Sequence, residues 1–487
     1  MSPIRSGMSR RKLLAGTAAL GLSGSAAALY FSGSTLAASH GGNANPLKIP
    51  PLLEGTLQDG TRTFDLNIQD GQTRFFPDVT TATRGINGSF LGPVLRLRKG
   101  ETTQFNVTNS LNENTTLHWH GFNLPAAADG GPHQIIRPGQ TWSPHFEIRE
   151  EASTMWYHSH LMGKTAEQVW SGIAGMARID DPETGSLGLP DTYGVDDIAI
   201  ALQDRTIFRD GSMPYRPGMH DRMMGYTGQI PMANGTVNAY FDATTSLVRL
   251  RLLNGSNGTI YNIGFSDGRR FHKIATDGGL LAAPVELQLM SMGPGERVEI
   301  LVDLSDGKNV TLTHFNRLSS SRVSPQFAFL ELRPTGQLAD SGPVPTTLAS
   351  LAAPDASKAV NTRRFVLNMA GMMMNSRFTI NNRQMDINYI NETVRKDTSE
   401  IWEVSNTSPM SHPFHVHNTQ FRILDRNGTP AQAHEAGRKD TVLVAPSETV
   451  RLLVRFDKYA DPDLPYMYHC HILEHEDAGM MGQFTVV

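Results

Sequence analysis

The chain has 487 residues, of which 39% are hydrophobic and 18% are charged, and its formal net charge at pH 7 is −4. This composition is typical of globular proteins, and the length accommodates about three domains of roughly 150 residues each. The slightly acidic balance excludes the broad basic surface that nucleic-acid-binding proteins use, so no nucleic-acid partner is expected.

The first 38 residues have the pattern of an export signal. Arg10 and Arg11 precede a run of small and apolar residues, from 15 to 30, that carries no charge. This pattern predicts a twin-arginine signal peptide at residues 1–38, the twin-arginine translocase as a partner during export, and a periplasmic protein. The alternative is a membrane anchor, but the run is shorter than the roughly 20 apolar residues that span a bilayer, so no stable membrane insertion is expected.

A strand pattern that ends in asparagine occurs three times in the rest of the chain. The asparagines are Asn109, Asn254 and Asn406, which lie 145 and 152 residues apart. A turn motif with a central proline keeps nearly the same period, at residues 137–141, 293–297 and 445–449. Two motifs with one period predict three copies of one domain built from short strands and turns.

The predicted fold class is therefore all-β, with one β-sandwich in each of the three domains. Composition changes place the domains at residues 46–190, 191–345 and 360–487.

Ten of the 17 histidines gather in four clusters. The clusters are His118 and His120; His158 and His160; His412, His415 and His417; and His469, His471 and His475. Side chains at positions i and i+2 of a strand point to the same face, so each His-x-His pair presents two imidazoles together. One such pair would suit an ordinary strand, whereas four clusters of this common copper ligand predict a metal site.

The clusters also keep register with the repeat. His118 lies nine residues after Asn109. His415 lies nine residues after Asn406, while the equivalent position of the middle repeat is Ile263. The metal cluster is therefore predicted between the first and third domains, with the middle domain as a spacer that holds them in place.

Cys470 is the single cysteine of the chain, so no intrachain disulfide can form. It lies between His469 and His471, and alternation along a strand points its thiol to the opposite face. A blue-copper site uses two imidazoles, one thiolate and a weak thioether, a set that zinc rarely adopts. The chain offers such a set: His412, Cys470, His475 and Met480.

In these clusters the chain resembles the multicopper oxidases, the family of laccases and ascorbate oxidase, over its whole length after residue 38. The resemblance implies a cupredoxin fold for each domain and an enzyme that passes single electrons from a reducing substrate to O2, which is reduced to water. It also implies four copper ions, one of type 1, one of type 2 and two of type 3, with the type 1 ion held by the blue-copper set.

The family pattern assigns the other eight histidines to a trinuclear cluster. It implies the type 2 ion at His118 and His415, one type 3 ion at His120, His158 and His469, and the other at His160, His417 and His471. Reduction of O2 consumes protons, and Asp129 and Glu476 resemble acidic positions of the bacterial branch that would provide them. Ordinary turn chemistry is the alternative for Asp129, which precedes two glycines.

The 21 methionines suggest which electron donor is used. Many lie at residues 213–224, which are expected to form a polar loop, and at 369–374. Thioethers are soft ligands that suit cuprous ion, although methionine also fills cores. The candidate ligands of a Cu(I) substrate are Met369, Met374 and Met410.

With the export signal, these methionines resemble the periplasmic copper-efflux oxidases, which implies oxidation of Cu(I), activity on phenols as well, and a role in copper tolerance. The chain lacks the longer Met- and His-rich insertion of those enzymes, and it has Ser408 where an acid is expected. One alternative is a general laccase for phenols and aromatic amines. Another is a copper-free structural scaffold, and a monomer is expected in each case.

Overall fold

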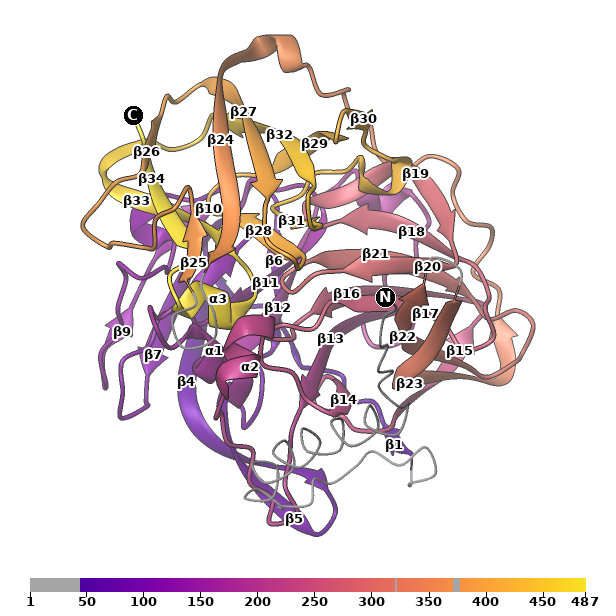
Figure 1. The fold of residues 1–487 in the computed structure, drawn as a ribbon. Coiled ribbons are helices and arrows are strands. Elements are labelled where there is room, and N and C mark those ends of the chain that lie inside the picture. Colours follow the sequence, from indigo (N-terminus) through magenta and orange to yellow (C-terminus); the bar gives the residue numbers. More distant parts are fainter. Residues whose placement is uncertain (1–43, 320–321, 371–376) are drawn as a thin grey trace, which may run out of the picture.

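The computed structural model describes residues 44–319, 322–370 and 377–487. The predicted signal peptide and Met374 lie outside the described residues. Within them the chain forms many strands and a few short helices, and the strands make six sheets (Figure 1). The predicted all-β class is confirmed, with three cupredoxin-like sandwiches of two sheets each.

The first sandwich pairs a sheet in the order β10-β7-β4-β3, flanked by β5 and β9, with a sheet in the order β2-β6-β12-β11-β8. Its strands are β2 (Leu52–Leu53), β3 (Thr56–Gln58), β4 (Thr61–Phe76), β5 (Val79–Ile86), β6 (Val94–Arg98), β7 (Thr102–Asn109), β8 (His118–His120), β9 (Thr141–Trp142), β10 (His145–Glu147), β11 (Ser153–His158) and β12 (Ala174–Asp180).

The middle sandwich pairs the sheets β1-β15-β23-β22-β17-β20 and β14-β13-β16-β21-β18-β19. Its strands are β1 (Asn45–Pro46), β13 (Asp197–Arg205), β14 (Ile230–Ala233), β15 (Ala239–Thr245), β16 (Leu247–Asn254), β17 (Tyr261–Phe265), β18 (Phe271–Thr276), β19 (Gly279–Leu287), β20 (Leu289–Met292), β21 (Arg297–Asp303), β22 (Val310–Ser319) and β23 (Arg322–Ala339).

The third sandwich pairs the sheets β25-β24-β27-β32-β29-β30 and β26-β34-β33-β28-β31. Its strands are β24 (Ala359–Ala370), β25 (Arg377–Ile380), β26 (Glu392–Val394), β27 (Thr398–Asn406), β28 (His412–Val416), β29 (Phe421–Arg426), β30 (Thr429–Pro430), β31 (Thr441–Val444), β32 (Thr449–Phe456), β33 (Asp461–Cys470) and β34 (Met481–Val486).

Three short α-helices, one from each sandwich region, lie side by side near the centre of Figure 1: α1 (Thr165–Ser171), α2 (Met219–Met224) and α3 (Leu473–Asp477). Single 3-10 turns occur at Ala126–Ala128, Thr184–Ser186, Ala356–Lys358 and Ala433–Glu435. Among the described residues, no helix has both the length and the apolar character needed to cross a membrane.

The repeated asparagines perform the same structural task in all three sandwiches. Each ends the strand β7, β16 or β27, and its side-chain amide donates to two backbone carbonyls at 2.7–3.0 Å. The backbone carbonyl of each asparagine accepts from the turn of the proline motif, at Gly139, Gly295 or Ser447. The two sequence motifs are therefore bonded to each other, which explains why they share one period.

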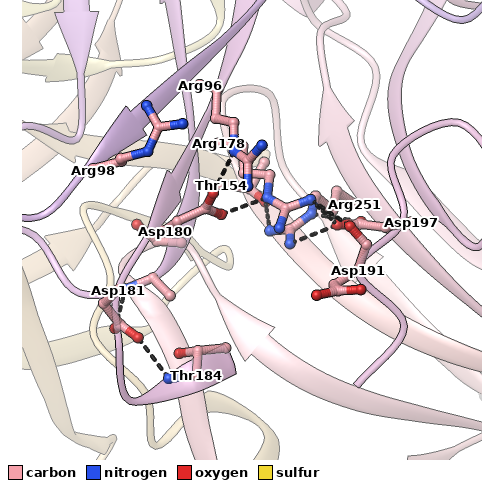
Figure 2. Close-up of polar contacts among 12 residues, drawn as sticks. Arg96, Arg98, Thr154, Arg178, Asp180, Asp181, Thr184, Asp191, Asp197 and Arg251 are labelled. Carbon is pink, nitrogen blue, oxygen red and sulfur yellow. Dashed lines mark hydrogen bonds and ion pairs between the residues drawn. The ribbon is translucent and has the colours of Figure 1, made fainter. Parts of the chain in front are cut away.

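The apolar cores show how the sandwiches are joined. Buried side chains of the first and third sandwiches form one continuous cluster, whereas the middle sandwich has its own core and shares two smaller apolar clusters with the first. The first and middle sandwiches are linked by a buried ion-pair network, in which Arg178 of β12 and Arg251 of β16 both bind Asp197 of β13, at 2.7–2.9 Å (Figure 2). Loss of one partner from such a buried pair costs about 3–5 kcal/mol, so this network resists separation of the sandwiches.

Candidate metal centre

Strands from the first and third sandwiches bring the His-x-His pairs together. In the first sandwich β8 lies antiparallel to β11, with His118 opposite His158. In the third, β28 lies antiparallel to β33, with His415 opposite His469. The eight side chains gathered here are at most 1% exposed: His118, His120, His158, His160, His415, His417, His469 and His471.

The two halves of this histidine cluster are in direct contact. The ring of His118 stacks on His417, with centroids 3.8 Å apart. The ring of His120 stacks on His415 at 3.6 Å. The structure thus places the cluster between the first and third sandwiches, where the register of the repeat predicts it.

The positions of His469 and His471 correct the grouping that the family pattern implied. The Nε2 atom of His469 lies 3.1 Å from that of His160 and 3.2 Å from that of His417. The ring centroid of His471 lies instead 5.1 Å from that of His120 and 5.4 Å from that of His158. Both side chains point to one face of the chain, so alternation could not tell them apart. The position of each side chain along the backbone decides which pair of histidines it contacts.

Hydrogen bonds at the periphery of the cluster define which nitrogen of each ring faces inward. The Nδ1 atoms of His118 and His415 donate to the backbone carbonyls of Asp129 and Asp440, both at 2.8 Å. The Nε2 atom of His120 donates to the Asp440 carboxylate at 2.9 Å. A neutral imidazole with one N–H engaged has its lone pair on the other nitrogen.

Those other nitrogens are unpartnered. Among the described residues, the Nε2 atoms of His118, His158 and His415 and the Nδ1 atom of His120 have no hydrogen-bond partner although they are buried. Burial lowers the pKa of these imidazoles, which keeps them neutral. Buried, neutral and inward-facing lone pairs fit metal ions, because burial of an unpaired acceptor is otherwise costly.

A second candidate site lies on the opposite face of β33. The Cys470 Sγ atom is 3.3 Å from Nδ1 of His412 and 3.6 Å from Nδ1 of His475, and all three residues are buried. Met480 is fully buried and its backbone N–H bonds to the carbonyl of His475 at 2.9 Å. Burial raises the pKa of the Cys470 thiol, so a cation is needed to stabilise a thiolate at this position.

The outer nitrogens of this site are also bonded. The Ser408 hydroxyl lies 2.7 Å from Nε2 of His412, so a neutral side chain occupies the place where an acid was expected. Nε2 of His475 donates to the backbone carbonyl of Met223 at 2.9 Å. Both rings are thereby turned with Nδ1 toward the thiol.

Comparison with known proteins identifies the family. Residues 67–184 and 361–487 match sequence profiles described as multicopper oxidase. A multicopper oxidase of Staphylococcus haemolyticus is 34% identical over 449 residues, which cover 91% of this chain and 92% of that protein. The chain belongs to the multicopper oxidase family. It is therefore an oxidoreductase that uses copper, a reducing substrate and O2.

Other relatives of this multicopper oxidase differ in role. The cell division protein FtsP of Escherichia coli K12 is 34% identical over 475 residues, covering 93% of this chain and 94% of FtsP. The solved structure of CueO from Ochrobactrum sp., a laccase-like multicopper oxidase active on lignin model compounds and lignosulfonate, has a TM-score of 0.83 and 35% identity. That match covers 91% of this chain and all of CueO.

The two acids suggested by the sequence both touch the histidine cluster of this multicopper oxidase. The Asp129 carboxylate accepts from Nδ1 of His417 at 2.9 Å. The Glu476 carboxylate lies 3.2 Å from Nδ1 of His469 and 3.4 Å from Nδ1 of His160. Burial raises the pKa of both carboxyl groups, so each retains a proton to a higher pH than an exposed acid does.

The methionine segment at residues 213–224 departs only in part from the expected polar loop, because its helix α2 buries none of its residues. Met213 is buried in an apolar cluster with Trp170 and other side chains, so it fills space. Residues Met219–Met224 form the helix α2, which packs against α3 and, through Met223, covers the edge of His475. Beside it lies a groove of about 340 Å³ whose lining includes Tyr215, Met219, Met223, Phe378, Glu474 and Asp477.

The candidate substrate ligands in the third sandwich lie near the thiol site. Met369 of β24 is paired with Phe378, whose ring stacks on His475 with centroids 4.4 Å apart. Met410 is partly buried against the shared core, two residues before His412.

Two contributors to the site escaped sequence reasoning. Asp440 follows no histidine motif, and Arg297 belongs to the middle domain, which was expected to act as a spacer. His314, which lies outside the four histidine clusters, accepts from the backbone of Asn262 at 2.9 Å and is a structural residue of the middle sandwich. The sequence does set Arg297 apart, because the equivalent residues in the other two copies of the proline motif are both threonines, Thr141 and Thr449.

Proposed function

We propose that this enzyme couples the one-electron oxidation of Cu(I), and also of phenols, to the four-electron reduction of O2 to water, with four copper ions bound. The observation that supports it is the set of buried imidazoles whose lone pairs face one another between two sandwiches. Bound copper would supply the redox capacity and the positions at which O2 reacts.

The ligand sets follow the contacts in the structure. The proposed type 1 ligands are His412, Cys470, His475 and Met480. The proposed type 2 ligands are His118 and His415. The proposed type 3 sets are His120, His158 and His471, and His160, His417 and His469.

The chain itself links the two sites. Cys470 is covalently continuous with His469 and His471, so the peptide backbone offers a short path from the thiol set to the cluster. Asp129 and Glu476 hold protons at carboxyl groups that touch cluster histidines, which suits the proton demand of water formation.

For the electron donor, cuprous ion is favoured by what covers His475. Helix α2 closes the direct approach to the His475 edge, and a small ion passes such a cover more readily than a bulky phenol does. Thioethers of Met219 and Met223 line the adjoining groove, and thioether is a ligand that suits Cu(I). Met369, Met374 and Met410 remain proposed ligands from the third domain.

Phenol oxidation is the second candidate. The groove has aromatic walls at Tyr215 and Phe378, and the related CueO of Ochrobactrum sp. acts on lignin model compounds. Outer-sphere electron transfer from a phenol to His475 by way of these aromatic side chains needs little specific binding of the phenol.

Oxygen uptake with Cu(I) and with dimethoxyphenol, each with and without added copper, separates the two candidates. We expect uptake with Cu(I) alone and a rise in phenol oxidation on adding copper. Met223→Leu is expected to reduce the Cu(I) rate, whereas Met213→Leu, which alters a buried packing methionine, serves as the matched control. A rate of phenol oxidation that is unchanged by added copper, together with no oxygen uptake with Cu(I), would refute the cuprous proposal.

The same preparation tests the alternative of a copper-free structural scaffold. Elemental analysis after copper loading is expected to give about four copper ions per chain, the number of the type 1, 2 and 3 sites. A value near zero would favour a structural scaffold.

Location and physiology are part of the proposal. We infer export to the periplasm by the twin-arginine route and a contribution to copper tolerance. Replacing Arg10 and Arg11 with lysine is expected to leave the protein in the cytoplasm and to lower growth of the host at high copper. Unchanged periplasmic activity in that variant would contradict the export route.

A further inference from the structure

One buried side chain of the middle sandwich reaches the histidine cluster. Arg297, the first residue of β21, is fully buried and donates two hydrogen bonds to the carboxylate of Asp440 in the third sandwich, from Nη1 at 2.7 Å and from Nη2 at 2.6 Å. The same carboxylate accepts from Nε2 of His120 in the first sandwich. A continuous chain of hydrogen bonds therefore crosses all three sandwiches and ends on a candidate ligand.

The segment around Asp440 is held from the middle sandwich at further points. The Asp277 carboxylate accepts from the backbone N–H of Asp440 at 3.3 Å and pairs with Nζ of Lys439 at 2.9 Å. The backbone carbonyl of Asp440 in turn accepts from Nδ1 of His415. The orientation of His120 and His415 thus depends on the position at which the middle sandwich holds Asp440 of the third sandwich.

The proline turn before β21 makes a second approach to the cluster. Gly295 has a φ of +83°, and a Cβ atom at this position would lie 2.8 Å from the His471 ring. The turn backbone therefore packs directly on that ring. In the outer repeats the equivalent residues are Thr141 and Thr449, whose hydroxyls lie 2.8 Å from those of Thr108 and Ser405. The middle copy of the motif therefore differs at the place where it meets the cluster.

We propose that Arg297 is a positioning residue for the histidine cluster, acting through Asp440. Its planar fork holds both carboxylate oxygens, which fixes the rotation of the carboxylate and hence the tautomer and ring orientation of His120, with Nδ1 turned toward the metal position. A lysine would neutralise the charge without fixing that rotation. This inference rests on the proposed copper cluster, and it makes the middle domain a part of the site.

Copper titration of the full-length chain tests the proposal. Arg297→Met keeps the length and the apolar stem but removes the fork, and Arg297→Lys keeps the charge. We expect Arg297→Met to weaken copper binding at the cluster by about 10–100-fold, measured by competition with a chelator, and Arg297→Lys to lie between it and wild type. Copper bound at the thiol site, followed by its blue absorption, should keep its wild-type affinity in both variants.

Arg251→Met is the matched control. Arg251 is a buried arginine of the same sandwich that also holds an aspartate, Asp197, with two hydrogen bonds (Figure 2). Among the described residues, the side-chain partners of Asp197 are arginines and include no candidate copper ligand. We expect this variant to lower the unfolding temperature of the copper-free protein while the cluster retains wild-type copper affinity. The electron paramagnetic resonance spectrum of the cluster copper should change in the Arg297 variants and not in this one.

The outcomes separate the two levels of the proposal. Equal cluster affinity and spectrum in wild type and Arg297→Met would overturn the positioning role and leave the proposed function intact. Parallel loss of affinity at both copper sites, in Arg251→Met as in Arg297→Met, would also overturn it. Absence of cluster copper in the wild-type chain would overturn the proposed function itself. If Arg297→Met does not fold, the spectrum and affinity of Arg297→Lys decide the question.

Discussion

Individual residues set the chemistry of the two sites. They do so by determining which nitrogen of each histidine is hydrogen-bonded to the protein. At the cluster, backbone carbonyls and the carboxylates of Asp129 and Asp440 take the outer N–H groups. At the thiol site, Ser408 and the carbonyl of Met223 take the same role without charge.

Replacing Cys470 tests the thiol site. Cys470→Ser puts a hydroxyl of similar size beside His412 and His475. We expect complete loss of blue colour and of oxidase activity, because serine provides no soft thiolate ligand. Absorption spectroscopy and oxygen uptake measure the loss, and circular dichroism checks that the fold persists. A variant that oxidises substrate at the wild-type rate would exclude Cys470 from the electron path.

Replacing Glu476 tests proton delivery. The raised pKa keeps this carboxyl protonated to higher pH than an exposed glutamate, so the rate of O2 reduction should fall as pH rises through that raised pKa. Glu476→Gln is isosteric but releases no proton, and the rate is expected to drop about 10²–10⁴-fold and to lose this pH dependence. Oxygen uptake against pH measures both effects. An unchanged pH profile would assign proton delivery to another group.

Among the secondary-structure elements, the strands follow the sequence patterns while the segment at α2 does not. β7 and β27 bury every second side chain over most of their length, as the alternation predicts. The methionine-rich residues read as a polar loop because no apolar period is visible over only six residues. Only the last six residues of the expected loop, Met219–Met224, form the helix α2, which packs on α3 from the far end of the chain.

The asparagine at the end of β16 provides a test at the level of an element. Asn254→Ala leaves the backbone carbonyls of Thr259 and Met292 without their donor in a buried turn. Each buried unsatisfied group costs about 1–3 kcal/mol, so the unfolding temperature should fall clearly. Asn309→Ala, at an exposed asparagine, is the control and should change it little. Equal effects in calorimetry would contradict the role given to the repeated asparagine.

In the molecule as a whole, the outer sandwiches share a large core and the histidine cluster. The middle sandwich joins both by buried ion pairs, and it joins the first by two smaller apolar clusters as well. We propose domains at residues 46–190, 191–345 and 360–487 on the basis of the repeat. The continuous core predicts that the first and third domains unfold together.

Copper removal tests this coupling. Ligands that bind only the folded state stabilise it by about 2.7 kcal/mol at a concentration 100 times their Kd. We expect chelation to lower the temperature of the joint transition of the outer domains, and less so in a His118→Ala variant. Differential scanning calorimetry follows the transition. A copper-dependent shift confined to the middle domain would be inconsistent with a cluster between the outer two.

The sequence by itself determined the all-β class, the threefold repeat and the identity of the histidines, because strand alternation, turn residues and metal-ligand types are local properties of the chain. Membership of the copper oxidases followed from the same motifs. Only the tertiary structure decided that His469 meets His160 and His417, that α2 covers His475, and that Arg297 reaches the cluster. These contacts join residues far apart in the chain, and their geometry is fixed by how the three sandwiches pack, which no local pattern specifies.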